Sequence, residues 1–193
     1  MRKPIIAGNW KMNKTISESI ELVNILKREL IDIQEVEIIV CPVYTALSDV
    51  SDLLVDSNIS LGAQNVYWEP SGAFTGEISP LMLKDIGCKY AIIGHSERRK
   101  YFNETDQSVN KRIKATQGSG LTPIFCVGET LEEREANKTT DVVKRQLAGG
   151  LEDLDKDALL NLILLMSQYG LLVLGKPQLA SKLKKFIVLL EVG

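Results

Sequence analysis

The chain has 193 residues, a formal net charge of -2 and 25% charged residues. This length suits one domain with a sizeable core. The charge lacks the basic excess that binding to a nucleic acid backbone requires, so we expect no nucleic acid partner.

Short β-branched apolar runs alternate with amphipathic segments along the chain, a pattern typical of βα units that build a parallel sheet. The predicted strands are Ile5–Trp10, Val36–Cys41, Ile59–Gln64, Tyr90–Gly94 and Thr122–Val127. The predicted helices are Ser17–Leu30, Ser79–Asp85, Ser96–Phe102, Thr105–Gln117, and one continuous helix from Glu132 through Thr139 to Leu151.

These strands are apolar on both faces, so both faces must be covered, either in a doubly wound sheet or in a closed barrel. Polar or turn-forming residues follow most strands at their carboxyl ends. A barrel carries its chemistry on that rim, whereas a doubly wound sheet concentrates it at one switch point. The pattern therefore favours a (βα) barrel. The rim residues are Asn9, Lys11, Pro42, Gln64, Asn65, His95 to Arg98, Gly128 and Glu129.

The sequence also indicates the compartment. The start, Met-Arg-Lys-Pro, carries no apolar signal region and cleavage site, so we expect a cytoplasmic protein. Cys41, Cys88 and Cys126 are odd in number and widely spaced, which predicts buried, reduced thiols and neither a disulfide framework nor a metal site. The Leu-rich stretch Ala158–Leu174 is interrupted by polar residues and falls short of the about 20 apolar residues that a membrane span needs.

Two rim residues are candidates for chemistry. Lys11 lies in "GNWKMN" and could hold a phosphate or a developing oxyanion; the alternative is a solvated loop lysine. His95 is the single histidine and lies where the fourth strand turns into a helix that Ser96 could cap. The positive helix terminus favours a neutral imidazole; the alternative is a hydrogen-bonded, partly buried histidine. "GNWKMN" lacks a dinucleotide or P-loop fingerprint, so no nucleotide cofactor is indicated.

Four segments occur in order at the ends of strands one, three, four and five: "AGNWKMN", "GAQNVYWEPSGAFTGEIS", "YAIIGHSERR" and "PIFCVGE". As a set they resemble the triosephosphate isomerase family, over roughly Pro4 to Leu164. The resemblance implies a (β/α)₈ TIM barrel and a homodimer. It also implies the interconversion of dihydroxyacetone phosphate and glyceraldehyde 3-phosphate, a step of glycolysis and gluconeogenesis, with no cofactor and no metal.

The resemblance also assigns roles. Asn9 and Lys11 would contact the substrate, with Lys11 placing its charge near the phosphate and the reacting oxygen. His95 would be the electrophile that polarises the carbonyl; this family is itself the known case of a histidine kept neutral by a helix terminus, so that point comes from the resemblance. Glu97 would pair with Lys11. Thr75, in the loop Gly72–Gly76, would reach the partner subunit, and the other supporting residues would be Ser96, Cys126 and Glu129.

The resemblance ends in the tail. Asn161–Leu164 suits the start of strand six, but the family's catalytic base is a glutamate in a motif close to "YEPVWAIGTGK", and this motif and the later phosphate-binding turns are absent from the chain as written. We therefore divide the chain into a partial barrel at residues 1–164, with about five to six βα units, and a non-family tail at residues 165–193.

A shifted reading frame explains this tail. The shifted frame joins the third base of each codon to the first two bases of the next codon. The codon of Met166 ends in G, and an AGN codon for Ser167 supplies A and G, so the two together give GAG, a glutamate codon. The same shift from Leu164 to Pro177, with permitted codons, reads "AYEPVWAIGTGKT". The loss of one base, or the gain of two, near Leu164 is therefore our hypothesis.

Two expectations of different class follow. One is a triosephosphate isomerase acting on a small triose phosphate substrate. The other is an inactive truncated remnant that lacks the catalytic base and the later phosphate-binding loops. We expect such a remnant to be poorly soluble, because an incomplete barrel would leave its first and last strands unpaired.

Overall fold

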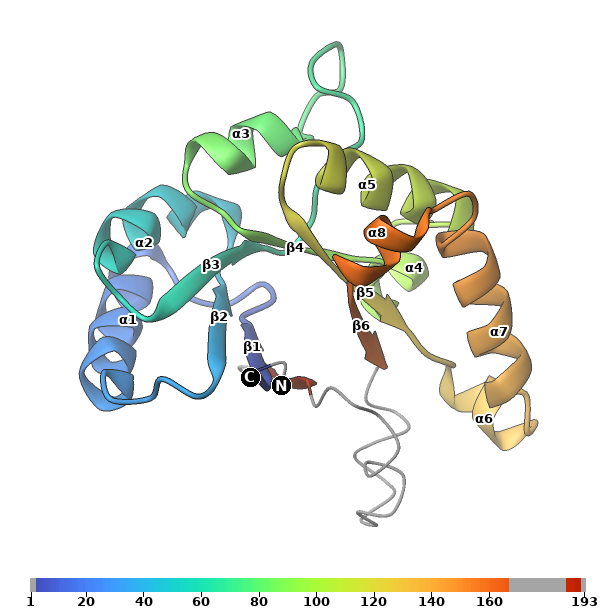
Figure 1. Cartoon of the computed structure of the whole chain (residues 1–193), viewed down its shortest axis with the longest axis horizontal. Coiled ribbons are helices and arrows are strands. Elements are labelled where there is room, and N and C mark those ends of the chain that lie inside the picture. Colours follow the sequence, from blue (N-terminus) through green and yellow to red (C-terminus); the bar gives the residue numbers. More distant parts are fainter. Residues whose placement is uncertain (1–2, 167–186, 192–193) are drawn as a thin grey trace.

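The computed structural model describes residues 3–166 and 187–191 (Figure 1). The strands are β1 (Ile5–Asn9), β2 (Glu37–Cys41), β3 (Ile59–Ala63), β4 (Tyr90–Ile93), β5 (Thr122–Val127), β6 (Ile163–Met166) and β7 (Ile187–Glu191). The helices are α1 (Ile16–Leu30), the 3₁₀ turn η1 (Tyr44–Ala46), α2 (Leu47–Leu54), α3 (Pro80–Asp85), α4 (Ser96–Tyr101), α5 (Asp106–Gly118), α6 (Leu131–Glu135), α7 (Thr139–Gly150) and α8 (Lys156–Leu160). Within these described ranges, no helix combines the length and apolarity that crossing a membrane demands.

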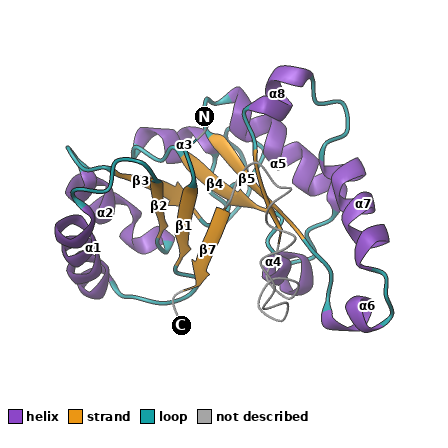
Figure 2. Ribbon diagram, turned by 60° about the horizontal axis from the view of Figure 1, so that its bottom comes forward, coloured by secondary structure: helices purple, strands orange, loops and turns teal. Residues whose placement is uncertain are grey.

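The strands in the described residues run parallel in one sheet, in the order β6-β5-β4-β3-β2-β1-β7. The sheet curls, and the helices cover its convex side, as Figures 1 and 2 show. Strands β1 to β6 form an incomplete barrel, which confirms the predicted fold class. The doubly wound alternative is wrong, because that arrangement would place helices on both sides of the sheet.

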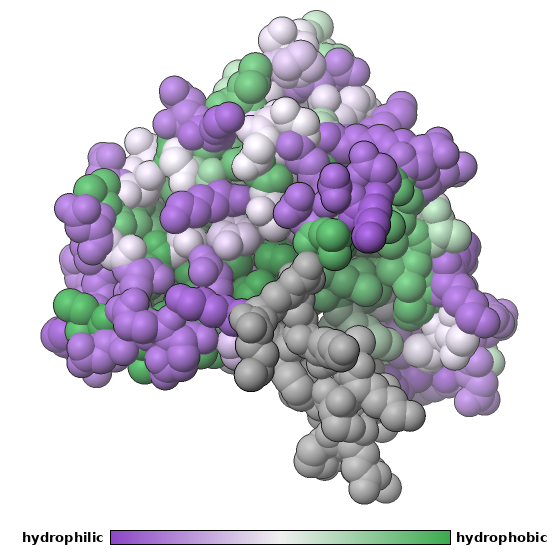
Figure 3. Space-filling model, viewed as in Figure 1, coloured by the Kyte–Doolittle hydropathy of each residue, from purple (hydrophilic) through white to green (hydrophobic). Residues whose placement is uncertain are grey.

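Alternating side chains divide the strands between two apolar layers. On β2, Ile38 and Val40 pack with helix residues such as Val23 in an outer layer. Ile39 and Cys41 face the other way and pack with residues of β1, β4, β5 and β6. Period-2 alternation with both faces buried is what the continuous apolar runs predict. The space-filling view in Figure 3 shows hydrophobic surface near the middle of the molecule and mostly hydrophilic surface over the helices.

Helix α1 illustrates how the sequence sets an element. Thr15 and Glu18 form a capping box: the Glu18 amide donates to Thr15 Oγ1 at 3.4 Å, and the Thr15 amide donates to Glu18 Oε2 at 2.8 Å. The apolar face then recurs at helical spacing, with Val23 fully buried and Leu26 and Leu30 packed against the core. Capping and periodicity agree, so the helix begins within one residue of the prediction.

One predicted helix is wrong. The segment from Glu132 to Leu151 forms two helices, α6 and α7, because the chain turns between them at Asn137. Asn137 has a φ of 57°, in the left-handed region that ends a helix and that asparagine tolerates better than most residues. Helices α2 and α8 are short and were not predicted.

The pairing of the first strand also differs from expectation. Strand β1 was expected to have one open edge, but β7 from the tail pairs with it in parallel, from Ile5 opposite Ile187 to Asn9 opposite Glu191. The opposite edge of β1 pairs with β2. Both edges of β1 are therefore hydrogen-bonded, and the exposed-edge argument for poor solubility does not hold for this strand.

Candidate functional site at the carboxyl rim

Residues that follow β1 and β4 meet around one carboxylate. Lys11 Nζ lies 2.9 Å from Glu97 Oε1, and His95 Nδ1 lies 3.6 Å from Glu97 Oε2. Lys11 and His95 come from different βα units, and they converge because the carboxyl ends of parallel strands lie at one edge of the sheet. The sheet thus brings the two candidate residues of the sequence analysis to a single place.

His95 is held in a defined orientation at the start of α4. Its Nδ1 accepts a hydrogen bond from the Glu97 amide at 3.3 Å, so His95 itself is the N-cap. The prediction that Ser96 caps this helix is wrong, because α4 already begins at Ser96. A ring nitrogen that accepts a hydrogen bond carries no proton, so the neutral imidazole assigned by this geometry has its proton on Nε2. The His95 side chain is only 7% exposed.

Lys11 has an unusual backbone. Its φ is 52°, in the left-handed region that non-glycine residues seldom occupy. Its amide donates to Asn9 Oδ1 at 3.1 Å, and its carbonyl accepts from Gln64 Nε2 at 2.8 Å. The side chain is 25% exposed and ion-paired, so the solvated-loop alternative does not describe it. Gln64 was identified only as a polar strand end; its position after a buried strand was the one available signal.

The peptide before His95 is constrained as well. Gly94 has a φ of 73°, and a Cβ placed there would lie 3.2 Å from the Cys126 carbonyl oxygen. Arg99 Nε donates to the Gly94 carbonyl at 2.9 Å, and Arg99 Nη1 donates to Asp106 Oδ1 at 2.6 Å. Glycine is required at this position because a side chain would meet both a strained backbone and a neighbouring strand.

The remaining predicted residues make contacts elsewhere. Cys126 is buried on β5, and burial raises the pKa of its thiol to about 12. Glu129 is buried, and its Oε1 lies 3.3 Å from Arg134 Nη1 and 3.2 Å from Thr139 Oγ1. Thr75 is exposed in a turn. None of these contacts reaches Lys11 or His95. All three predicted cysteine thiols are free and buried, as expected.

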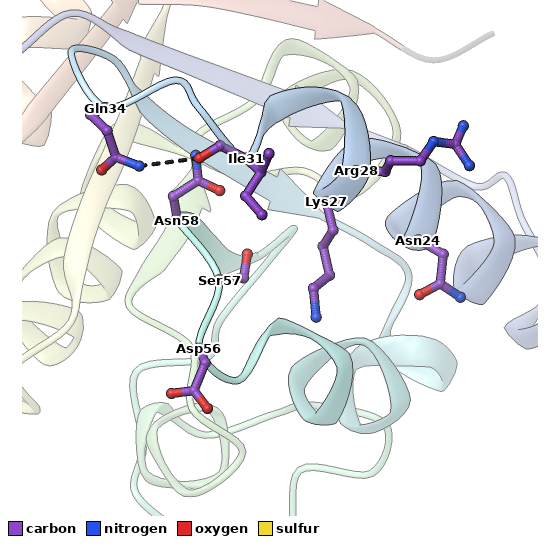
Figure 4. Close-up of a pocket in the computed structure, with 8 residues that line it drawn as sticks. All are labelled: Asn24, Lys27, Arg28, Ile31, Gln34, Asp56, Ser57 and Asn58. Carbon is purple, nitrogen blue, oxygen red and sulfur yellow. Dashed lines mark hydrogen bonds between the residues drawn. The ribbon is translucent and has the colours of Figure 1, made fainter.

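A cavity of about 420 Å³ lies at the other end of the strands, between α1 and the residues that lead into β3 (Figure 4). Its amides are engaged locally: Gln34 Nε2 donates to the Ile31 carbonyl at 3.2 Å, and Asn58 Nδ2 donates to the Leu30 carbonyl at 2.6 Å. We do not assign it as the active site, because it lies at the amino end of β3 and barrel chemistry occurs at the carboxyl rim.

The fold and the rim together define the class of the protein: a barrel-type α/β protein with a lysine and a neutral histidine around one carboxylate. Comparison with known proteins then identifies the family. The triosephosphate isomerase family model matches residues 4–166. The chain belongs to the triosephosphate isomerase family.

Individual relatives agree. The triosephosphate isomerase of Alkaliphilus oremlandii is 57% identical over 164 residues, which cover 85% of this chain and 66% of that protein. The enzyme of Moorella thermoacetica is 46% identical over 191 residues, 99% of this chain and 76% of that protein. The crystal structure of triosephosphate isomerase from Bartonella henselae superposes with a TM-score of 0.79 at 42% identity, covering 86% of this chain and 68% of that chain. The chain spans just under two thirds of the Alkaliphilus enzyme's length.

Proposed function

We propose that the protein acts as a triosephosphate isomerase, interconverting dihydroxyacetone phosphate and glyceraldehyde 3-phosphate. The observation that supports this best is the convergence of Lys11 and His95 on Glu97 at the carboxyl rim. This reaction removes a proton from the carbon next to the carbonyl and returns one to the former carbonyl carbon, so it needs a group that stabilises the enediolate and a base that transfers the proton.

Lys11 and His95 supply the first requirement. A cation 2.9 Å from its counter-ion Glu97 remains available to attract a phosphate and a developing oxyanion, since its side chain is 25% exposed. His95, with Nδ1 occupied by the Glu97 amide, presents Nε2–H as a hydrogen-bond donor to the substrate oxygen. Asn9, whose Oδ1 holds the Lys11 amide, lies at the same strand end and would contact the substrate.

Whether the protein carries the catalytic base depends on the reading frame of its gene. We propose that residues 1–164 are the partial barrel, that residues 165–193 are a tail from a shifted frame, and that the corrected frame carries the glutamate of "YEPVWAIGTGK". A positioned general base contributes roughly 10²- to 10⁴-fold to the rate of proton transfer. The chain as written should therefore isomerise triose phosphate at least about 100-fold more slowly than the frame-corrected chain.

The test compares three proteins in an assay of glyceraldehyde 3-phosphate formation: the chain as written, the frame-corrected chain read from the gene to the stop codon of the restored frame, and that frame-corrected chain with His95→Gln. The corrected chain should turn over, and His95→Gln should lower its kcat by about 10²-fold or more. Absence of turnover in the corrected chain would refute the proposed function. A gene sequence with no "YEPVWAIGTGK" in any frame would refute the frameshift.

A second candidate is a remnant that binds triose phosphate without isomerising it. For the chain as written, this candidate is favoured because neither of the two rim carboxylates, Glu97 and Glu129, replaces the missing base. Glu97 is paired with Lys11, and buried Glu129 is paired with Arg134. If the chain as written binds dihydroxyacetone phosphate with no turnover, this candidate is correct.

The assembly and compartment are proposed on separate grounds. A homodimer is supported by exposed apolar side chains near the predicted contact loop, where Phe74 is 40% exposed beside Thr75, and by Met12, which is 94% exposed. A cytoplasmic location is supported by three free thiols, since oxidising compartments favour disulfides. Sedimentation of the purified protein measures the oligomeric state, and fractionation of cells measures the location.

A further inference from the structure

We propose that Gln64 is the positioning residue that holds Lys11 in its working conformation, an inference that rests on the proposed function. Gln64 touches neither His95 nor Glu97 in any hydrogen bond described above, so it would act through Lys11. Its role is inferred from the backbone of Lys11 and from the two hydrogen bonds that the Gln64 amide group donates.

Lys11 needs an external restraint. At a φ of 52°, an L-residue with a long side chain is in a conformation that the chain leaves readily unless its neighbours hold it. No glycine provides that freedom here, since the sequence reads Asn9-Trp10-Lys11-Met12-Asn13. A relaxed backbone at Lys11 would rotate the side chain and change the 2.9 Å separation between Nζ and Glu97 Oε1.

Gln64 supplies the restraint with both hydrogens of one NH₂ group. Its Nε2 donates to the Lys11 carbonyl at 2.8 Å and to the Cys41 carbonyl at 2.9 Å. Cys41 ends β2 and pairs with Asn9 at the end of β1, so one acceptor belongs to the rigid sheet and the other to the strained residue. On the other side of Lys11, Asn9 Oδ1 accepts the Lys11 amide hydrogen. Both peptide groups of Lys11 are therefore fixed to the sheet.

The two hydrogen bonds donated by the Gln64 NH₂ group make the proposal specific. An amide of this length donates two hydrogen bonds, whereas an ionised glutamate only accepts. Gln64→Glu would turn a donor toward two carbonyl oxygens into a repelling carboxylate, and Gln64→Met would remove the donors while keeping the length. Both changes should free the Lys11 carbonyl. They leave Lys11, His95 and Glu97 unchanged.

Two measurements test the idea, with Gln34→Glu as the matched control. Gln34→Glu replaces the same amide by the same carboxylate, but Gln34 Nε2 donates to the Ile31 carbonyl on an exposed turn. The first measurement is amide hydrogen exchange of Lys11 in the full chain, observed by NMR. The Lys11 amide donates to Asn9 Oδ1, and we expect this bond to open more often once the Lys11 carbonyl is no longer held by Gln64. Gln64→Glu and Gln64→Met should therefore speed exchange of the Lys11 amide by about tenfold, and Gln34→Glu should leave it unchanged.

The second measurement separates positioning from general stability. In the frame-corrected chain, Gln64→Met should lower kcat for dihydroxyacetone phosphate by about tenfold, and it should have no further effect in a Lys11→Ala background. A purely structural role would instead reduce activity by the same factor in both backgrounds. Unchanged exchange at Lys11, or fully additive kinetics, would overturn the proposal. If the unsubstituted corrected chain shows no turnover, the proposed function fails, while the exchange measurement still decides whether Gln64 holds Lys11.

Discussion

Gly150 and Gly118 offer a paired test of the packing between a helix and the sheet. Each is the last residue of its helix, α7 and α5 respectively. A Cβ placed at Gly150 would lie 2.4 Å from Phe125 Cζ, and Phe125 is fully buried on β5. A Cβ placed at Gly118 would meet no atom within 4 Å. The same methyl group is therefore added to one closed and one open environment.

We expect Gly150→Ala to lower the free energy of unfolding by about 1–3 kcal/mol, the usual cost of overpacking a rigid core. Gly118→Ala should raise it by about 0.4–1 kcal/mol, because alanine has fewer unfolded conformations to lose. For a domain of this size the Gly150 variant should melt roughly 2–12 °C below the parent.

Urea denaturation followed by circular dichroism measures both free energies, with the melting temperature as a second readout. A Gly150 variant as stable as the parent would show that α7 is not packed against the ring of Phe125. Equal destabilisation of both variants would show that the helix ends, and not the neighbouring ring, decide the effect. Either result would refute the packing argument.

Two further predictions concern charge. Glu104 is 2% exposed, and its Oε1 lies 2.5 Å from Arg98 Nε and 3.6 Å from Arg112 Nε, so Glu104→Gln should leave two arginines without their anion and lower the free energy of unfolding by about 3–5 kcal/mol, measured by urea titration. A loss below about 1 kcal/mol would mean that solvent replaces the carboxylate. Burial raises the pKa of Cys88 and Cys126 to about 12, so their protonated thiols stabilise the fold below their ordinary pKa of about 8.5, and this contribution is lost as the pH rises from there toward 12. The melting temperature should fall over that range, and Cys88→Ala should make the fall shallower; an unchanged slope would contradict it.

Much of the fold could be predicted from the sequence. The strands β1 to β5 lie within one residue of their predicted bounds, because each is an apolar run closed by polar or turn-forming residues. The start of α1 was equally readable from Thr15 and Glu18. The break between α6 and α7 was not, because asparagine also occurs inside helices and the positive φ of Asn137 is a property of the folded backbone.

The candidate site was predictable in part. Lys11 and His95 were found as polar residues at strand ends and, by the resemblance, as members of two motifs. Their contacts with Glu97 are consistent with that prediction, while their catalytic roles remain proposals. Gln64 carried no assigned role, since a glutamine after a strand is an ordinary residue until its two acceptors, the carbonyls of Lys11 and Cys41, are known.

The sequence by itself determined the local features of this protein: where apolar strands begin and end, which helices are capped, and which motifs carry the family's signature. These depend on neighbours along the chain, whose spacing is fixed by the covalent backbone. The tertiary structure decided which side chains meet and which strand lies beside β1. Hydrogen bonds such as those of Gln64, and the pairing of β1 with β7, join residues far apart in sequence, and their partners exist only once the sheet has curled.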